Sequence, residues 1–174
     1  MTDEKVLIIY GSWLGSTKDV AERIAEVFKA EGAANVDVMT GAEIKEVKSY
    51  DSVVLGSAVR AGMLPGRFRR PVKKFSKHLK SKPMAGFMVC AEMTSEDDDN
   101  KEAQSQAYLT KFTDPIPEVK LLEVTAFKGA FLDENAGGLF KKVVKKMGES
   151  GGKDLREWDV IEGWARETYG KLTA

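Results

Sequence analysis

A hydroxyl-rich turn lies near the start of the chain, between an apolar run at residues 6–9 and a helical pattern. From Tyr10 to Thr17 it reads YGSWLGST. Its glycines let the backbone approach a ligand closely, and its hydroxyl groups can donate hydrogen bonds. The start of a helix also directs free N–H groups and partial positive charge outward. These features together predict a phosphate site.

Two common kinds of phosphate site are excluded by the spacing of this turn. A triphosphate loop needs lysine and then serine or threonine after its last glycine. Here Gly15 is followed by Ser16, Thr17 and Lys18, which is the wrong order. A dinucleotide fingerprint needs three glycines spaced G-x-G-x-x-G, and the turn has two in another spacing. A single phosphate group remains, and an ordinary helix cap at Ser16 or Thr17 is the alternative.

The rest of the chain alternates short apolar runs with helical patterns. Apolar runs without alternation, separated by helices, are typical of a parallel sheet covered on both faces. We expect a brief helical segment at 43–47 and Pro71 in the first turn of its helix, where the missing N–H costs little. We expect strands at 6–10, 35–39, 52–56, 85–90 and 120–127, and helices at 17–30, 68–79, 105–112 and 159–172.

The sequence therefore predicts a single α/β domain over residues 1–174, with a doubly wound five-stranded parallel sheet. Ligands of such sheets lie beyond the carboxyl ends of the strands, where the strand order reverses. We expect the third strand to lead into a loop from Ser57 to Met63, and the fourth into a loop that starts at Cys90. Both loops would converge with the phosphate turn.

The turn S-x-x-G-S-T after a first strand resembles the phosphate loop of flavodoxins, which hold the phosphate of FMN. This resemblance implies a flavodoxin-like fold, with an insert at 131–157 before the last helix, and FMN as the cofactor. The implied cofactor-binding residues are Ser12, Trp13, Leu14, Gly15, Ser16, Thr17, Ser57, Ala58, Val59, Arg60, Ala61, Gly62, Cys90, Ala91 and Glu92.

Later motifs resemble one branch of these proteins, the menaquinone-dependent protoporphyrinogen oxidases. That family has a G-A-S-I-R-x-G turn and then a helix with F-x-x-x-V-K-K. This chain has the corresponding residues LGSAVRAG at 55–62, then Phe68 and VKK at 72–74. The further matches are Gly129-Ala130, Lys146-Met147, Gly151-Gly152, Asp154 and a reversed pair, Trp158-Asp159.

The resemblance implies an FMN-dependent oxidoreductase that passes electrons to a quinone-like acceptor, with protoporphyrinogen oxidation as the implied reaction. Arg60 would stabilise a reduced flavin or bind an anionic substrate, or it is a solvated loop arginine. No aromatic residue lies at 58–63 or 90–100, so we do not expect aromatic rings on both faces of the flavin. A flavodoxin-type electron carrier between redox proteins is one alternative, and an interaction domain without flavin is another.

The charges balance overall, with 27 basic and 27 acidic residues, but they are segregated along the chain. A basic run at 67–82 and an acidic run at 92–102 are most simply solvated faces. The basic run could also dock an anionic partner or a membrane surface. We do not expect nucleic-acid binding, because the charge of the whole chain is balanced.

Residues 139–147 form a basic amphipathic pattern that could contact a membrane or pack on the domain. We therefore expect a cytoplasmic protein, or one held peripherally at the inner face of the membrane, whose partner is a redox protein or a quinone. The single cysteine, Cys90, excludes a disulfide within the chain and is expected to be a small core residue. His78 is expected to place favourable charge near the end of its helix.

Overall fold

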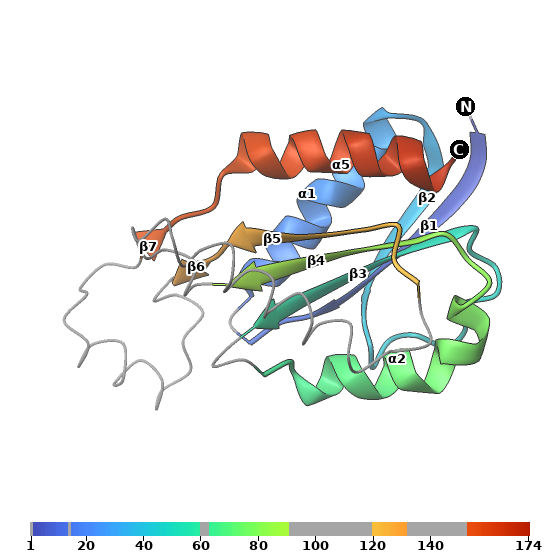
Figure 1. The fold of residues 1–174 in the computed structure, drawn as a ribbon, viewed down its shortest axis with the longest axis horizontal. Coiled ribbons are helices and arrows are strands. Elements are labelled where there is room, and N and C mark those ends of the chain that lie inside the picture. Colours follow the sequence, from blue (N-terminus) through green and yellow to red (C-terminus); the bar gives the residue numbers. More distant parts are fainter. Residues whose placement is uncertain (1, 14, 60–62, 91–119, 132–152) are drawn as a thin grey trace.

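A five-stranded parallel sheet with the order β2-β1-β3-β4-β5 forms the centre of the structure (Figure 1). The computed structural model describes residues 2–13, 15–59, 63–90, 120–131 and 153–174. The elements in chain order are β1 (Thr2–Gly11), α1 (Ser16–Ala30), β2 (Ala33–Thr40), β3 (Ser52–Val59), α2 (Gly66–Leu79), β4 (Met84–Cys90), β5 (Glu123–Lys128), β6 (Ala130–Phe131), β7 (Lys153–Asp154) and α5 (Trp158–Leu172). The predicted flavodoxin-like doubly wound fold is confirmed.

Helices cover both faces of the sheet, with α1 and α5 on one face and α2 on the other (Figure 1). Successive residues of the central strands alternate between the two cores, because side chains along a strand point to opposite faces. Val54 of β3 packs under α1 and α5, whereas Val53 and Leu55 pack under α2. This double burial explains why the strands read as continuous apolar runs.

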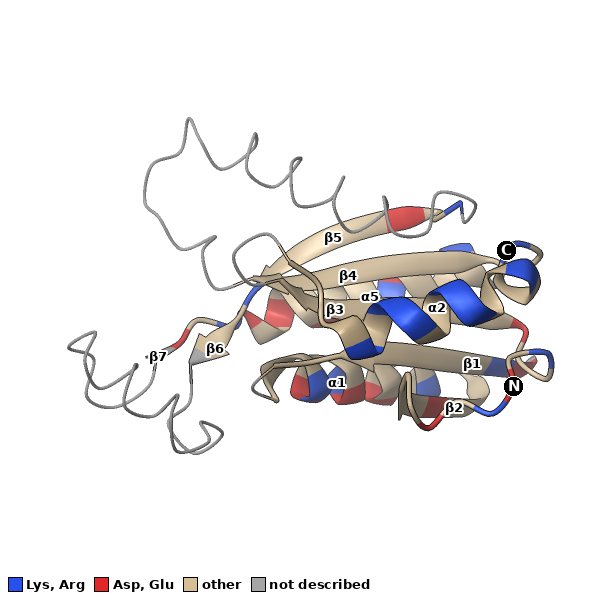
Figure 2. Ribbon diagram, turned by 90° about the horizontal axis from the view of Figure 1, so that it is seen from below, with Lys and Arg blue, Asp and Glu red and all other residues tan. Residues whose placement is uncertain are grey.

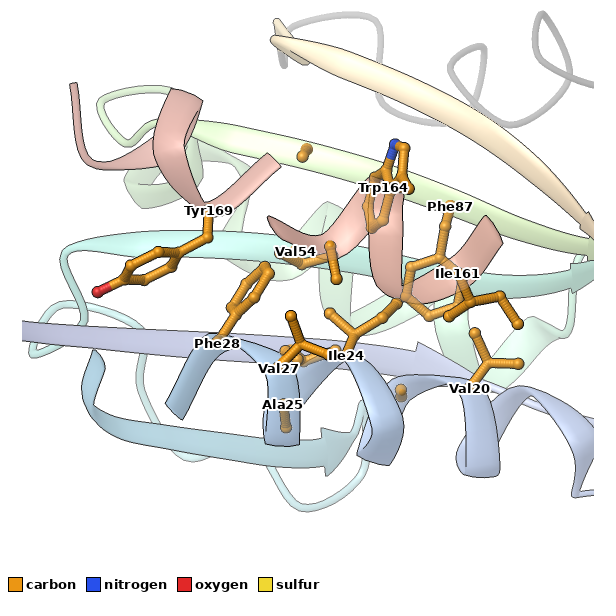
Figure 3. Packing of buried hydrophobic residues seen from close by; sticks show 14 of the residues in the cluster. Val20, Ile24, Ala25, Val27, Phe28, Val54, Phe87, Ile161, Trp164 and Tyr169 are labelled. Carbon is orange, nitrogen blue, oxygen red and sulfur yellow. The ribbon is translucent and has the colours of Figure 1, made fainter. Parts of the chain in front are cut away.

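Aromatic rings join the two helices of the first face to the sheet (Figure 3). Phe28 of α1 and Tyr169 of α5 have ring centroids 5.3 Å apart. Trp164 of α5 meets Phe87 of β4 edge-on at 6.1 Å and Phe127 of β5 at 5.6 Å. The last helix is therefore anchored by its inward residues, as its sequence pattern predicted.

The third strand is longer than predicted, and the expected boundary after Gly56 is wrong. Ser57, Ala58 and Val59 continue β3 and pair with Met88, Val89 and Cys90 of β4. All three are buried. Glycine and serine resemble a loop in sequence, but pairing with a neighbouring strand on each side overrides that local preference.

Two local helix predictions are also wrong. Residues 43–47 are not helical: a turn ends at Glu43, whose carboxylate accepts bonds from the N–H and the hydroxyl of Thr40, both at 2.7 Å. Such side-chain bonds to the backbone compete with helix formation. Pro71 is the sixth residue of α2, because the helix begins at Gly66 after Pro65 rather than near residue 68. The predicted helices at 105–112 and 139–147 lie outside the described residues.

The segment before α5 begins and ends on a short antiparallel ribbon, which the sequence did not predict. Ala130 of β6 pairs with Asp154 of β7, and Phe131 pairs with Lys153. The Leu155 N–H donates to the carbonyl of Gly129 at 3.2 Å. Residues 131 and 153 are thus held side by side, next to the carboxyl end of β5.

Candidate functional site

The turn between β1 and α1 is held in shape by its own serine. The Gly15 N–H donates to Ser12 Oγ at 2.8 Å. Gly15 has a φ of 93°, in the left-handed region that glycine adopts without steric cost. Ser12 therefore acts first as an acceptor inside the turn, and its hydroxyl hydrogen remains available to a ligand.

The first turn of α1 is open to an anion. Gly15 is the residue that precedes the helix, and no side chain caps it. The alternative of an ordinary cap at Ser16 or Thr17 is therefore excluded, because Ser16 is already the first helical residue. The N–H groups at the first two helical positions have no acceptor within a helix, and the helix dipole places positive charge there.

Thr17 supplies an independent indication of a missing acceptor. Its side chain is fully buried, and its Oγ1 atom has no hydrogen-bond partner among the described residues. A buried hydroxyl without a partner costs about 1–3 kcal/mol. A phosphate at the start of α1 would be an acceptor of the required kind, so the donor set of this turn fits FMN.

Gly11 fixes the base of the turn against α2. A Cβ atom at Gly11 would lie 2.5 Å from Cβ of Phe68, which is a buried residue of α2. Contacts this short do not occur, so only glycine allows β1 to end so close to the helix. Trp13, two residues on, is 46% exposed, and its predicted contribution through the backbone stays a prediction.

The carboxyl ends of β3 and β4 lie beside this turn, in the order that the sequence predicted. Ser57 pairs with Gly11 on one side and Met88 on the other, and Val59 pairs with Cys90. The Ser57 hydroxyl donates to the carbonyl of Ala58 at 3.1 Å. Ser57 to Val59 are strand residues, so their expected role in a loop is corrected to one at the end of the sheet.

Cys90 is buried at the end of β4, with 1% of its surface exposed, as expected for a small core residue. Its carbonyl accepts from the N–H of Gly129 at 3.3 Å, which ties β4 to the start of the β6–β7 ribbon. Six other predicted site residues lie outside the described residues: Leu14, Arg60, Ala61, Gly62, Ala91 and Glu92.

Arg156 is a residue beside the site that the sequence analysis missed. Its guanidinium binds the carboxylate of Asp154 through Nε at 2.8 Å and Nη2 at 2.6 Å, and that of Asp19 through Nη1 at 2.7 Å. It also stacks on the ring of Trp158, at 4.7 Å from the centroid. These bonds lower the pKa of Asp154 below its ordinary value.

Arg156 therefore links the exit of the β6–β7 ribbon to the first turn of α1. Asp19 and Arg156 are 137 residues apart in sequence, and neither belongs to a motif that would have paired them. The only available signal was their position, since Asp19 follows the phosphate turn and Arg156 precedes the last helix.

Comparison with known families gives one match that covers most of the chain. A family model described as "Flavodoxin domain" matches residues 7–156. Curated relatives of this chain carry the name "Protoporphyrinogen IX dehydrogenase [quinone]". The protein from Escherichia coli (strain K12) is 29% identical over 109 residues, which are 62% of this chain and 59% of that protein. The protein from Leishmania major is 30% identical over 113 residues, which are 62% of this chain and 47% of that protein.

Solved structures share the fold at low sequence identity. Oxidised Flavodoxin 1 from Bacillus cereus has a TM-score of 0.52 at 16% identity and covers 97% of this chain and 98% of its own. A short-chain flavodoxin associated with a bacterial microcompartment has a TM-score of 0.60 at 10% identity, with 98% and 99% covered. The flavodiiron protein from Giardia intestinalis has a TM-score of 0.58 at 11% identity and covers 97% of this chain and 35% of its own.

Proposed function

This chain belongs to the flavodoxin domain family, whose cofactor is FMN, and from that premise we propose that it is an oxidoreductase that passes electrons to a quinone. The names of the two curated relatives support a quinone as acceptor and protoporphyrinogen as the electron donor. The chain spans 59% and 47% of the lengths of these relatives. Donor and acceptor are therefore both part of the proposal.

The open first turn of α1 is the observation that carries the cofactor site. Ser12 sets the conformation of Gly15, the N–H groups of Ser16 and Thr17 would hold the phosphate, and the buried Thr17 hydroxyl would gain an acceptor. FMN, when bound, supplies the hydride and electron chemistry. The ends of β3 and β4 would border the ring, and we propose Arg60 to Gly62, Ala91 and Glu92 as its further contacts.

An electron carrier without its own small-molecule substrate is the second candidate. At the carboxyl ends of β1, β3 and β4, the titratable side chains among the described residues are the half-buried phenol of Tyr10 and the buried thiol of Cys90. General acid or base catalysis needs a group within hydrogen-bond reach of the substrate. A carrier needs none, and burial raises the pKa of the Tyr10 phenol, so that it gives up its proton less readily; this fits a carrier that moves no protons.

Two glycines with a positive φ allow a controlled test of the phosphate site. Gly15 has a φ of 93° before α1, and Gly32 has a φ of 112° after it. Alanine at either position is strained by about 1–2 kcal/mol. We expect both G15A and G32A to lower the melting temperature, but only G15A to weaken FMN binding, measured by quenching of flavin fluorescence. Equal FMN affinity in the two variants would contradict the assigned site.

An assay of protoporphyrinogen oxidation, with and without a menaquinone analogue, distinguishes the enzyme from the electron carrier. An enzyme should turn over faster than the same concentration of free FMN and should depend on the quinone. Turnover at the free-flavin rate would favour the carrier.

Contact of residues 139–147 with a membrane remains a proposal. Among the described residues, no helix is long and apolar enough to cross a bilayer.

A further inference from the structure

The outer face of α2 is strongly basic (Figure 2). No acidic residue occurs between positions 66 and 82. Six cationic side chains on the helix are exposed, and we call them the α2 basic face: Arg67, Arg69, Arg70, Lys73, Lys74 and Lys77. The whole chain has no net charge, so this face results from segregation of charge rather than from an excess of basic residues.

The α2 basic face points away from the sheet. Phe68, Val72, Phe75 and Leu79 are the buried residues of this helix, and they pack against the sheet. On a helix with 3.6 residues per turn, these four share one side, and the six cations occupy the opposite side. The cations therefore form one continuous surface along the length of the helix.

The opposite layer of the molecule, formed by α1 and α5, has its positive charges neutralised by ion pairs. Arg23 of α1 binds Glu162 of α5 at 2.6 Å, Arg166 binds the same carboxylate at 3.1 Å, and Lys171 binds Glu123 at 2.9 Å. Within the described ranges, no carboxylate lies within 4.0 Å of any cation of the α2 basic face. Among the described residues, its charge is therefore not neutralised by ion pairs of the kind that join α1 and α5.

We propose that the α2 basic face binds the surface of a bilayer that contains anionic lipids. Each lysine or arginine near such a surface contributes about 1 kcal/mol, and four to eight on one helix are typical of lipid recognition. A protein interface usually has an apolar core, and α2 exposes no large apolar side chain. A plane of lipid headgroups needs only the charges that this helix presents.

The position of α2 relates this surface to the candidate site. The helix follows the carboxyl end of β3, and Met63 just before it is 61% exposed. Its first turns therefore lie at the edge of the sheet where the phosphate turn lies (Figure 1). The surface itself does not depend on the proposed electron acceptor, although an acceptor dissolved in the bilayer would be close to it.

Vesicle co-sedimentation with two matched triple variants tests the proposal. R69Q/K73Q/K77Q removes three charges from the α2 basic face, and K29Q/R166Q/K171Q removes three from the opposite layer. Glutamine has nearly the helix propensity of lysine and arginine, so both variants should fold. Bound FMN and circular dichroism verify this for each protein, independently of lipid binding.

We expect the wild type to bind vesicles of phosphatidylcholine with phosphatidylglycerol, but not vesicles of phosphatidylcholine alone. Binding should weaken with salt, because added ions screen exposed charges. The α2 variant should lose at least about tenfold in binding, and the control variant should bind like the wild type. Equal losses in the two variants, or none in the α2 variant, would overturn the proposal. So would a wild type that binds duplex DNA but not the anionic vesicles.

Discussion

Arg156 Nη1 lies 2.7 Å from Oδ2 of Asp19, so the residue that leads into α5 neutralises a carboxylate in the first turn of α1. The Arg156 side chain is 7% exposed, whereas that of Asp19 is 45% exposed. The arginine is thus fixed by its surroundings, and the aspartate lies near the N–H groups that would hold a phosphate.

Replacing Arg156 with alanine should weaken both the fold and FMN binding. Asp19 and Asp154 would lose their partner, and Trp158 its stacked guanidinium, so we expect a loss of about 1–2 kcal/mol in the free energy of unfolding. The uncompensated charge of Asp19 should also repel the phosphate and weaken FMN binding about fivefold. Urea titration and flavin fluorescence measure the two effects.

Two further variants identify the cause. Adding D19N to R156A should restore FMN affinity without restoring stability, because it removes the repelling charge but no packing defect. Arg166, whose ion pairs are exposed, is the control, and R166A should change stability by less than about 0.5 kcal/mol. If D19N/R156A bound FMN as weakly as R156A, electrostatic repulsion would not be the reason.

Replacing Thr17 with valine should separate ligand binding from folding. Valine has nearly the shape of threonine but lacks the hydroxyl that has no partner in the structure. We expect the apoprotein to be as stable as the wild type, or more stable, because a buried polar group is removed. FMN affinity should fall about tenfold, corresponding to the loss of about 1.4 kcal/mol. Isothermal titration with FMN and thermal melting without it decide the matter.

Replacing Gly56 with alanine should destabilise the centre of the sheet. The new Cβ would lie 2.2 Å from Cζ of Phe87, whose ring is held between Phe127 and Trp164. We expect a loss of about 1–3 kcal/mol in the free energy of unfolding. Gly163 is the control, because a Cβ there meets nothing within 4 Å. G163A should stabilise the helix by about 0.5–1 kcal/mol, and a comparable loss in both variants would contradict the packing argument.

Tyr50 should make stability depend on pH in the alkaline range. Burial, and then the hydrogen bond from its hydroxyl to Asp37 at 2.8 Å, raise the pKa of Tyr50 from 10.0 to about 12. The folded state therefore favours the neutral phenol. Its contribution is fully present below pH 10.0 and is lost as the pH rises to about 12. Denaturant titrations across this range should show a smaller decline for Y50F than for the wild type.

The order of strands and helices could be predicted because each strand is buried on both faces and reads as an apolar run. The local signals were less reliable where contacts distant in sequence decide the structure. Gly56 and Ser57 look like the start of a loop, yet pairing with β4 extends β3 to Val59. Residues 43–47 look helical, yet Glu43 bonds to Thr40 and closes a turn.

The candidate site could be predicted only where its residues are close together in the sequence. The phosphate turn is contiguous, so its glycines and hydroxyl groups could be recognised from spacing alone. The bond between Asp19 and Arg156 joins two ends of the chain, and no local pattern carries it. The unpartnered hydroxyl of Thr17 is likewise a property of burial, which only the folded chain reveals.

The β6–β7 ribbon has a consequence for how this fold tolerates change. Since Phe131 and Lys153 are paired, the chain leaves the sheet and returns to it at nearly the same point. The segment between residues 131 and 153 therefore starts and ends at adjacent points, so its length does not change the distance between β5 and α5. The entropy of closing a loop grows only slowly with its length. The segment between residues 131 and 153 could thus be lengthened or exchanged while the cofactor-binding framework stayed the same.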